Sequence, residues 1–217
     1  MKPYDSNSRE GLSRVIPLPT VTYSQTDDSV CKTYDVTGSR SVGVLSLKAL
    51  NLVIRETEAL PFDACVVCTS YDLAKRGRTE VLGIPECLVL RFEDVTSEGD
   101  PGRFTRDLAR EAVRHFEGPA DARAFGFACD SGTSRSAAMA AAFMRHLEVD
   151  DWCIWGDPRL SPNPLVYRMM AQAWGVAVTE DEAEVLRAAN ELELARIIRS
   201  TYVGAGEALP SGPDLFG

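Results

Sequence analysis

One cysteine of the 217-residue chain stands where its neighbours could make it a nucleophile. Around Cys129 the sequence reads FGFACDSGTSRSAAMAAA, which is an apolar run, a turn of small residues, and an alanine-rich run that opens at Arg135. If these runs form a strand and a helix, the backbone N–H groups of residues 130–135 and the helix N-terminus converge on one point. The same donors bind a phosphoryl group and stabilise a thiolate. The sequence therefore predicts a phosphate-binding loop with Cys129 as its nucleophile.

Residue types within this loop fit the same chemistry. Gly132 lets the backbone bend where a Cβ would clash. Arg135 can hold two phosphoryl oxygens at once and stays charged. The residues expected to surround the bound phosphate are Asp130, Ser131, Gly132, Thr133 and Ser134.

A bare Cys-x5-Arg spacing is weak evidence, because arginine is common in this chain and the spacing also occurs from Cys153 to Arg159. That second copy contains the bulky Trp155, and Pro158 removes a backbone donor directly before the arginine. No helix is expected to begin at Arg159. We therefore expect a structural loop at the second copy and the reactive site at Cys129.

The pattern Cys-x-x-Gly-x-Ser-Arg-Ser of residues 129–136 resembles the signature of cysteine-dependent dual-specificity and protein tyrosine phosphatases. Residues 92–101 and 157–163 extend the similarity to a group of small bacterial phosphatase-like proteins, over about residues 41–175. The resemblance implies that Cys129 attacks phosphorus and that Arg135 holds the phosphoryl group. It also implies that Ser136 assists breakdown of the phosphocysteine, without a metal or another cofactor.

The resemblance further implies a general acid on a loop about thirty residues before the cysteine. Asp94 lies 35 positions upstream, directly after the apolar run CLVLRF, and Asp100 lies 29 positions upstream. We favour Asp94, because a residue at the end of a strand is held more firmly than one in a Gly-Asp-Pro turn. For each aspartate taken alone, a solvated surface carboxylate is the alternative.

One position departs from the pattern of the family. The residue before the nucleophile is usually histidine, and here it is Ala128. A histidine would order the loop and support the thiolate. We expect its absence to weaken the enzyme without abolishing its activity.

Strands and helices alternate from residue 41 onward, which is typical of a parallel sheet covered on both faces. The expected strands are 42–45, 64–69, 87–92 and 123–128, and the expected helices are 47–59, 105–116, 136–147, 164–174 and 180–200. We predict one phosphatase-like α/β domain of three layers, α/β/α, with a central, mostly parallel sheet of about four strands. The expected parts of the chain are a loosely ordered extension (1–40), the catalytic domain (41–175), a C-terminal helix (176–203) and a mobile tail (204–217).

Composition excludes several other classes of protein. The chain is 45% apolar and 25% charged, as in ordinary globular proteins, and its net charge of −9 disfavours binding to nucleic acid or to an anionic membrane. No apolar run reaches the roughly 18 residues of a membrane span, and no signal peptide is visible, so a cytoplasmic protein is expected. For the same reason the six cysteines are expected to be free, with Cys65 and Cys68 inside a buried strand. No cluster of metal ligands appears.

The sequence as a whole predicts hydrolysis of a phosphomonoester through a phosphocysteine, with phosphotyrosine on a protein as the favoured substrate. Two alternatives stay open: a phosphate-binding pseudophosphatase, and a phosphatase of a small phosphorylated metabolite. The acidic Asp130 in the loop argues against polyanionic inositol lipids. The oligomeric state is not predicted.

Overall fold

The computed structural model describes residues 20–23, 31–36, 40–77 and 79–204, and its centre is a six-stranded sheet in the order β1-β2-β3-β6-β4-β5. The strands are β1 (Thr20–Tyr23), β2 (Cys31–Val36), β3 (Arg40–Ser46), β4 (Ala64–Thr69), β5 (Cys87–Arg91) and β6 (Ala124–Cys129). From β3 to β5 the neighbouring strands run parallel, whereas β1 and β2 pair antiparallel at one edge. The carboxyl ends of the four parallel strands therefore meet at one edge of the sheet.

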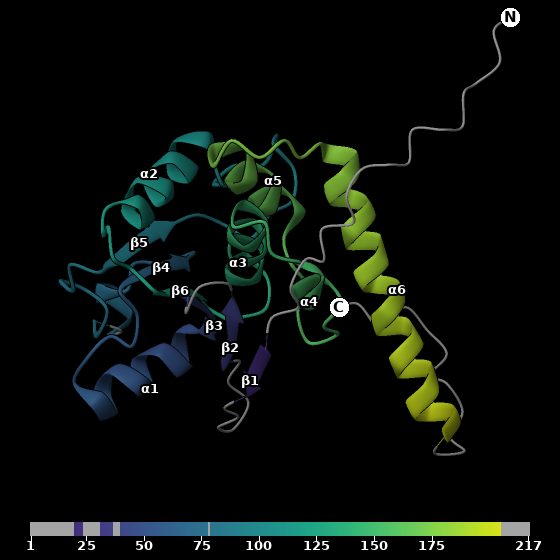
Figure 1. Ribbon diagram of the computed structural model, residues 1–217, viewed down its shortest axis with the longest axis horizontal. Helices are drawn as coiled ribbons and strands as arrows, with labels where there is room; N and C mark the ends of the chain where they lie inside the picture. Colours follow the sequence, from purple (N-terminus) through teal and green to yellow (C-terminus); the bar gives the residue numbers. More distant parts are fainter. Residues whose placement is uncertain (1–19, 24–30, 37–39, 78, 205–217) are drawn as a thin grey trace, which may run out of the picture.

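Helices cover both faces of this sheet (Figure 1). Helix α1 (Leu47–Thr57) packs on one face, and α2 (Arg106–Glu117), α3 (Arg135–His146) and α5 (Pro164–Ala173) pack on the other. The short α4 (Trp152–Trp155) and the long α6 (Glu180–Gly204) follow beside α3 and α5, and a 3-10 turn spans Ala74–Arg76. The expected three-layer α/β/α architecture is confirmed. Within the described residues, no helix is long and apolar enough to cross a lipid bilayer.

Strand β6 contributes to both faces because its side chains alternate. Phe125, Phe127 and Cys129 point into the larger core beneath α3, whereas Ala128 belongs to the smaller core beneath α1. The side chain of Cys129 thus points to the face of the sheet that α3 covers.

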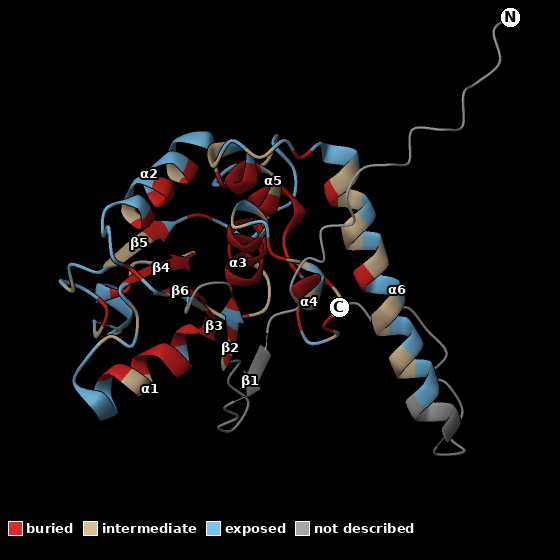
Figure 2. Cartoon of the chain, in the orientation of Figure 1, coloured by how far each residue is buried: buried red, intermediate tan, exposed pale blue. Residues whose placement is uncertain are grey.

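Helix α3 is the most deeply buried helix in the described chain, and Figure 2 shows it buried over nearly its whole length. Every residue from Arg135 to Met144 is buried. Five alanines make this possible, since small side chains let the backbone approach the sheet and α5 closely. The helix that begins at the loop is therefore held on all sides.

Two strands overturn the expectation that residues 1–40 form only a loose extension. β1 and β2 lie within that range, so the sheet has six strands and not about four. The strand period of β2 is hidden in the sequence because Lys32, a charged residue, occupies a buried position and pairs with Asp157. Helix α4 is also unpredicted, α6 runs to Gly204, and the expected mobile tail from 205 onward lies outside the described residues.

Candidate active site

The loop between β6 and α3 lies at the carboxyl edge of the parallel strands. β6 ends at Cys129 and α3 begins at Arg135, each within one residue of the bounds that the sequence predicts. Gly132 has a φ of 80°, and a Cβ on it would come within 2.4 Å of the Ser46 backbone nitrogen. The loop is therefore pressed against the end of β3 in a conformation that favours glycine.

The sulfur of Cys129 is surrounded by hydrogen-bonding groups. The Gly132 N–H donates to Sγ at 3.2 Å, and the hydroxyl of Ser136 lies 3.1 Å from Sγ. Cys129 and Ser136 are both almost fully buried. These donors and the N-terminus of α3 stabilise negative charge on the sulfur.

Arg135 is held in place by several acceptors, and its side chain is only 5% exposed. Nη1 donates to the Phe92 carbonyl at 2.8 Å and to the Ser70 hydroxyl at 3.1 Å, and Nη2 donates to Asp130 at 2.5 Å. Its Nε is buried and has no hydrogen-bond partner in the described part of the chain. Burial opposes the charge, but Asp130 and the Cys129 sulfur outweigh it and raise the pKa of Arg135 above its usual value.

Asp94 is brought directly to this loop. Its Oδ1 accepts hydrogen bonds from Asn163 Nδ2 at 2.8 Å and from the Ser134 hydroxyl at 3.0 Å, and its Oδ2 lies 3.9 Å from Arg135 Nε. The rival, Asp100, bonds through its backbone to Ser97 and Arg103, and no hydrogen bond or ion pair recorded for the described residues joins it to the loop. Of the two candidate acids, Asp94 is the one in contact with the loop between β6 and α3.

The remaining loop residues are placed in different ways. Asp130 lies between Arg135 and the Thr69 hydroxyl, which donates to it at 3.3 Å. The hydroxyls of Ser131 and Thr133 bond to each other at 2.8 Å on the exposed rim. The side chain of Ser134 bonds to Asp94, so only its backbone is left for a phosphate.

Three residues that contact the site were not predicted, namely Thr69, Ser70 and Asn163. Thr69 ends β4, the strand beside β6, and Ser70 directly follows it, so parallel topology alone would place both at the site. Asn163 stands directly before Pro164, a pattern typical of a helix N-cap. Nothing in the local sequence shows that it also contacts Asp94.

The second Cys-x5-Arg spacing forms no such cradle. Cys153 lies inside α4, and burial raises the pKa of its thiol to about 12. Arg159 pairs with Asp157, two residues before it in the same loop. The contacts of this segment stabilise the fold, which agrees with the structural loop that the sequence predicts.

Ala128 is fully buried on the face of β6 opposite to Cys129. It packs in the smaller core with Leu45, Leu47 and Val67. A larger side chain at this position would have to displace packed apolar atoms.

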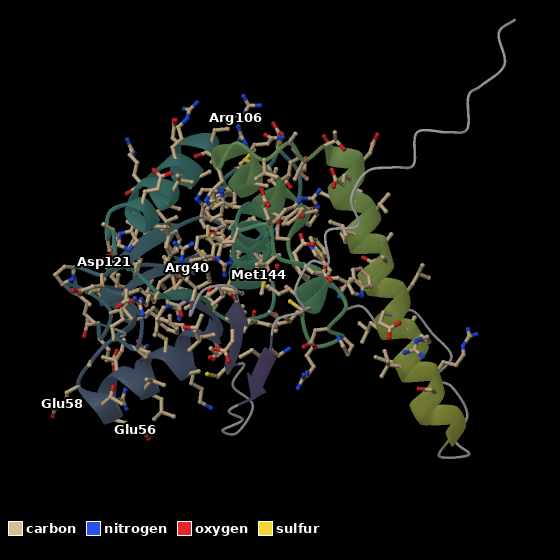
Figure 3. All side chains as sticks on the ribbon, viewed as in Figure 1. Arg40, Glu56, Glu58, Arg106, Asp121 and Met144 are labelled. Atoms are coloured by element: carbon tan, nitrogen blue, oxygen red, sulfur yellow. The ribbon has the colours of Figure 1, made fainter. Side chains whose placement is uncertain are left out.

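A hollow of about 850 Å³ lies at the other end of the sheet, far from the loop. Glu58, Phe62 and Asp121 are among its lining residues, and Figure 3 shows Glu58 and Asp121 projecting at that end of the molecule. Four carboxylates contribute to its wall, and none of the residues of loop 129–136 does. Because no residue of the loop lines this hollow, it has no part in the chemistry proposed for Cys129, in spite of its size. Within the described residues, no three His, Cys, Asp or Glu side chains converge as metal ligands.

No known family model matches the chain, and neither does any curated protein. Three solved structures resemble it. The PTP-2 phosphatase of Cydia pomonella is 17% identical, with 60% of this chain and 84% of that chain covered and a TM-score of 0.41. PTPMT1 is 16% identical (75% and 96% covered, TM-score 0.35), and PTPMT1 in complex with PI(5)P is 17% identical (74% and 96% covered, TM-score 0.33). The function of this chain therefore has to be argued from its own loop.

Proposed function

We propose that the protein hydrolyses phosphomonoesters through a phosphocysteine intermediate on Cys129. The observation that carries this proposal is the buried Nε of Arg135. It is a charged donor that makes no hydrogen bond within the described residues, although Asp94 Oδ2 lies 3.9 Å away, and it belongs to the same loop as the hydrogen-bonded sulfur of Cys129. A buried donor without a partner costs roughly 1–3 kcal/mol. An oxygen of a bound phosphoryl group would satisfy it.

In the first step, the Cys129 thiolate attacks phosphorus opposite the leaving oxygen. A P–S bond forms and the P–O bond breaks, while Asp94 gives its proton to the leaving oxygen. Oδ2 of Asp94 accepts no hydrogen bond within the described residues, so this oxygen is free to carry that proton. Arg135 and the N–H groups of the loop neutralise the phosphoryl oxygens.

In the second step, water releases phosphate from the cysteine. The Asp94 carboxylate takes a proton from the water as its oxygen attacks phosphorus and the P–S bond breaks. The hydroxyl of Ser136, 3.1 Å from Sγ, donates to the sulfur as it leaves with its negative charge. The contact of Ser136 with the same sulfur supports this role.

Phosphotyrosine on a protein is the proposed substrate. The carboxylate of Asp130 lies beside Arg135, so the site keeps a negative charge that a polyanionic substrate would not favour. We expect a higher kcat/KM for a phosphotyrosine peptide than for PI(5)P, the ligand of one similar structure. The reverse order would move the proposal to lipid substrates, and activity only on small phosphorylated metabolites would select that alternative.

Ala128 favours a second candidate, a protein that binds phosphate without turning it over. Alanine provides neither a hydrogen bond nor a charge to the loop. Such a protein would bind vanadate or a phosphopeptide and release no phosphate.

Turnover of 4-nitrophenyl phosphate tests the proposal. We expect vanadate-sensitive release of nitrophenol by the wild type, loss by about 10⁴-fold or more in Cys129→Ser, and no change in the matched control Cys153→Ser. Acid quenching during turnover should trap one phosphoryl group on Cys129. Equal activity of Cys129→Ser and wild type would refute the proposal, and binding without turnover would select the second candidate.

A further inference from the structure

The side chain of Asn163 joins the segment that carries Asp94 to the N-terminus of α5. Its Oδ1 accepts from the N–H groups of Leu165 at 3.0 Å and Val166 at 3.1 Å, which makes it the N-cap of α5. Its Nδ2 donates to Asp94 Oδ1 at 2.8 Å and to the Val95 carbonyl at 3.0 Å. Asn163 is 3% exposed, so both halves of its amide are used within the protein.

Residues 92–105, which carry Asp94, form neither helix nor strand. A general acid on such a segment needs an external support, because proton transfer depends on fixed geometry. Asn163 provides it at two points, since it holds both the carboxylate of Asp94 and the backbone of Val95. With Ser134 also on Oδ1, only Oδ2 is left for the proton.

Capping alone does not require asparagine. Aspartate and serine cap helices about as well, because the cap needs only an oxygen acceptor. The N–H donors toward Asp94 and Val95 are what those two residues lack. We propose that Asn163 is a positioning residue that fixes Asp94 for proton transfer, an inference that rests on the proposed function.

The test uses Asn163→Asp and Asn163→Ser, which keep the cap acceptor and remove the two amide N–H donors; serine retains a single O–H on a shorter side chain. The matched control is Thr179→Ala, which removes the hydroxyl that accepts from the Glu182 N–H at the start of α6. For phenyl phosphate, whose leaving group needs a proton, we expect kcat/KM, which reports the steps up to cleavage of the P–O bond, to fall roughly 10–100-fold in both Asn163 variants. For 2,4-dinitrophenyl phosphate, whose leaving group departs unprotonated, kcat/KM should stay within about threefold.

A double-mutant cycle separates positioning from a general effect on the fold. On an Asp94→Asn background, which has no acid to position, Asn163→Ser should lower kcat/KM no further. Thr179→Ala should lose stability without any dependence on the leaving group. Both Asn163 variants are checked by thermal unfolding, so a poorly folded protein is recognised before kinetics are read.

Equal losses with both leaving groups, or additive losses in the cycle, would overturn the role of Asn163 and leave the proposed function intact. A wild type that turns over neither ester would instead overturn the proposed function, and the role of Asn163 with it.

Discussion

Arg135 divides its donors between structure and chemistry. Two nitrogens are engaged, one by Phe92 and Ser70 and the other by Asp130, and these contacts fix the plane of the guanidinium. The third nitrogen, Nε, has no hydrogen-bond partner in the described chain. Because these contacts hold the guanidinium, the phosphoryl group of the proposed substrate would meet a donor that needs no rearrangement.

The reactivity of Cys129 can be tested by alkylation. Iodoacetate should label Cys129 first, because its sulfur accepts a hydrogen bond from the Gly132 N–H and lies near the N-terminus of α3. Burial raises the pKa of Cys68 well above its usual range and that of Cys153 to about 12, so both should react slowly. Peptide mapping of the labelled sites, with and without phosphate, is the measurement. Uniform labelling, or labelling that phosphate does not slow, would contradict the assignment.

The general acid can be tested by paired substitutions. Asp94→Asn should lower kcat/KM, which reports the steps up to P–O cleavage, by roughly 10²–10⁴-fold for phenyl phosphate and far less for 2,4-dinitrophenyl phosphate. Asp100→Asn is the control, because Asp100 has no recorded contact with the loop in the described structure. Steady-state kinetics on both esters decide between them. If only Asp100→Asn shows the dependence on leaving group, Asp100 is the acid.

At the scale of elements, the parallel strands of the sheet were predictable from the local pattern of apolar and turn residues. β4 has the expected bounds, Ala64–Thr69, because a short apolar run between turn residues has few other interpretations. The strand, loop and helix around Cys129 were predictable for the same reason. β2 was not, because Lys32 breaks its pattern and the partner that explains Lys32 lies 125 positions away. The contact of Asn163 with Asp94, across 69 positions, is likewise invisible without the fold.

β6 also limits what can be changed beside the nucleophile. Ala128 is fully buried against Leu45, Leu47 and Val67, so Ala128→His should destabilise the protein by about 1–3 kcal/mol through overpacking. The free energy of unfolding in urea measures this, and Ala128→Gly serves as a control that adds no volume. A stable Ala128→His with raised kcat/KM would show that the position can accept a histidine that supports the loop.

At the scale of the whole molecule, charge does not attract the proposed substrate. The net charge is −9, so an anionic phosphomonoester is repelled at long range and is captured only by the local donors of the loop. Inside the fold, opposite charges form an ion pair that joins two parts of the chain. Lys32 on β2 forms a buried ion pair with Asp157, in the loop after α4, and so joins the antiparallel edge of the sheet to the segment that leads to Asn163 and α5.

This ion pair predicts how stability depends on pH. Burial alone would raise the pKa of Asp157, but hydrogen bonds from Arg159 and Lys32 outweigh it and hold the pKa below its ordinary value of 3.8. The folded state therefore binds this proton less tightly than the unfolded state. The contribution of Asp157 to stability is complete above about pH 4 and is lost as the pH falls through the lowered pKa.

Lys32→Met should lower the free energy of unfolding at pH 7 by about 3 kcal/mol, because among the described residues it leaves Asp157 buried with Arg159 alone as a cationic partner. The double variant Lys32→Met/Asp157→Leu should recover most of that loss, since an apolar pair of similar volume needs no compensating charge. It should also lose less stability than the wild type between pH 5 and pH 3, because the titrating carboxyl is gone. Urea unfolding of the three proteins at pH 7, 5 and 3 measures each difference. A Lys32→Met variant as stable as the wild type would show that the ion pair does not hold the edge strands to the domain.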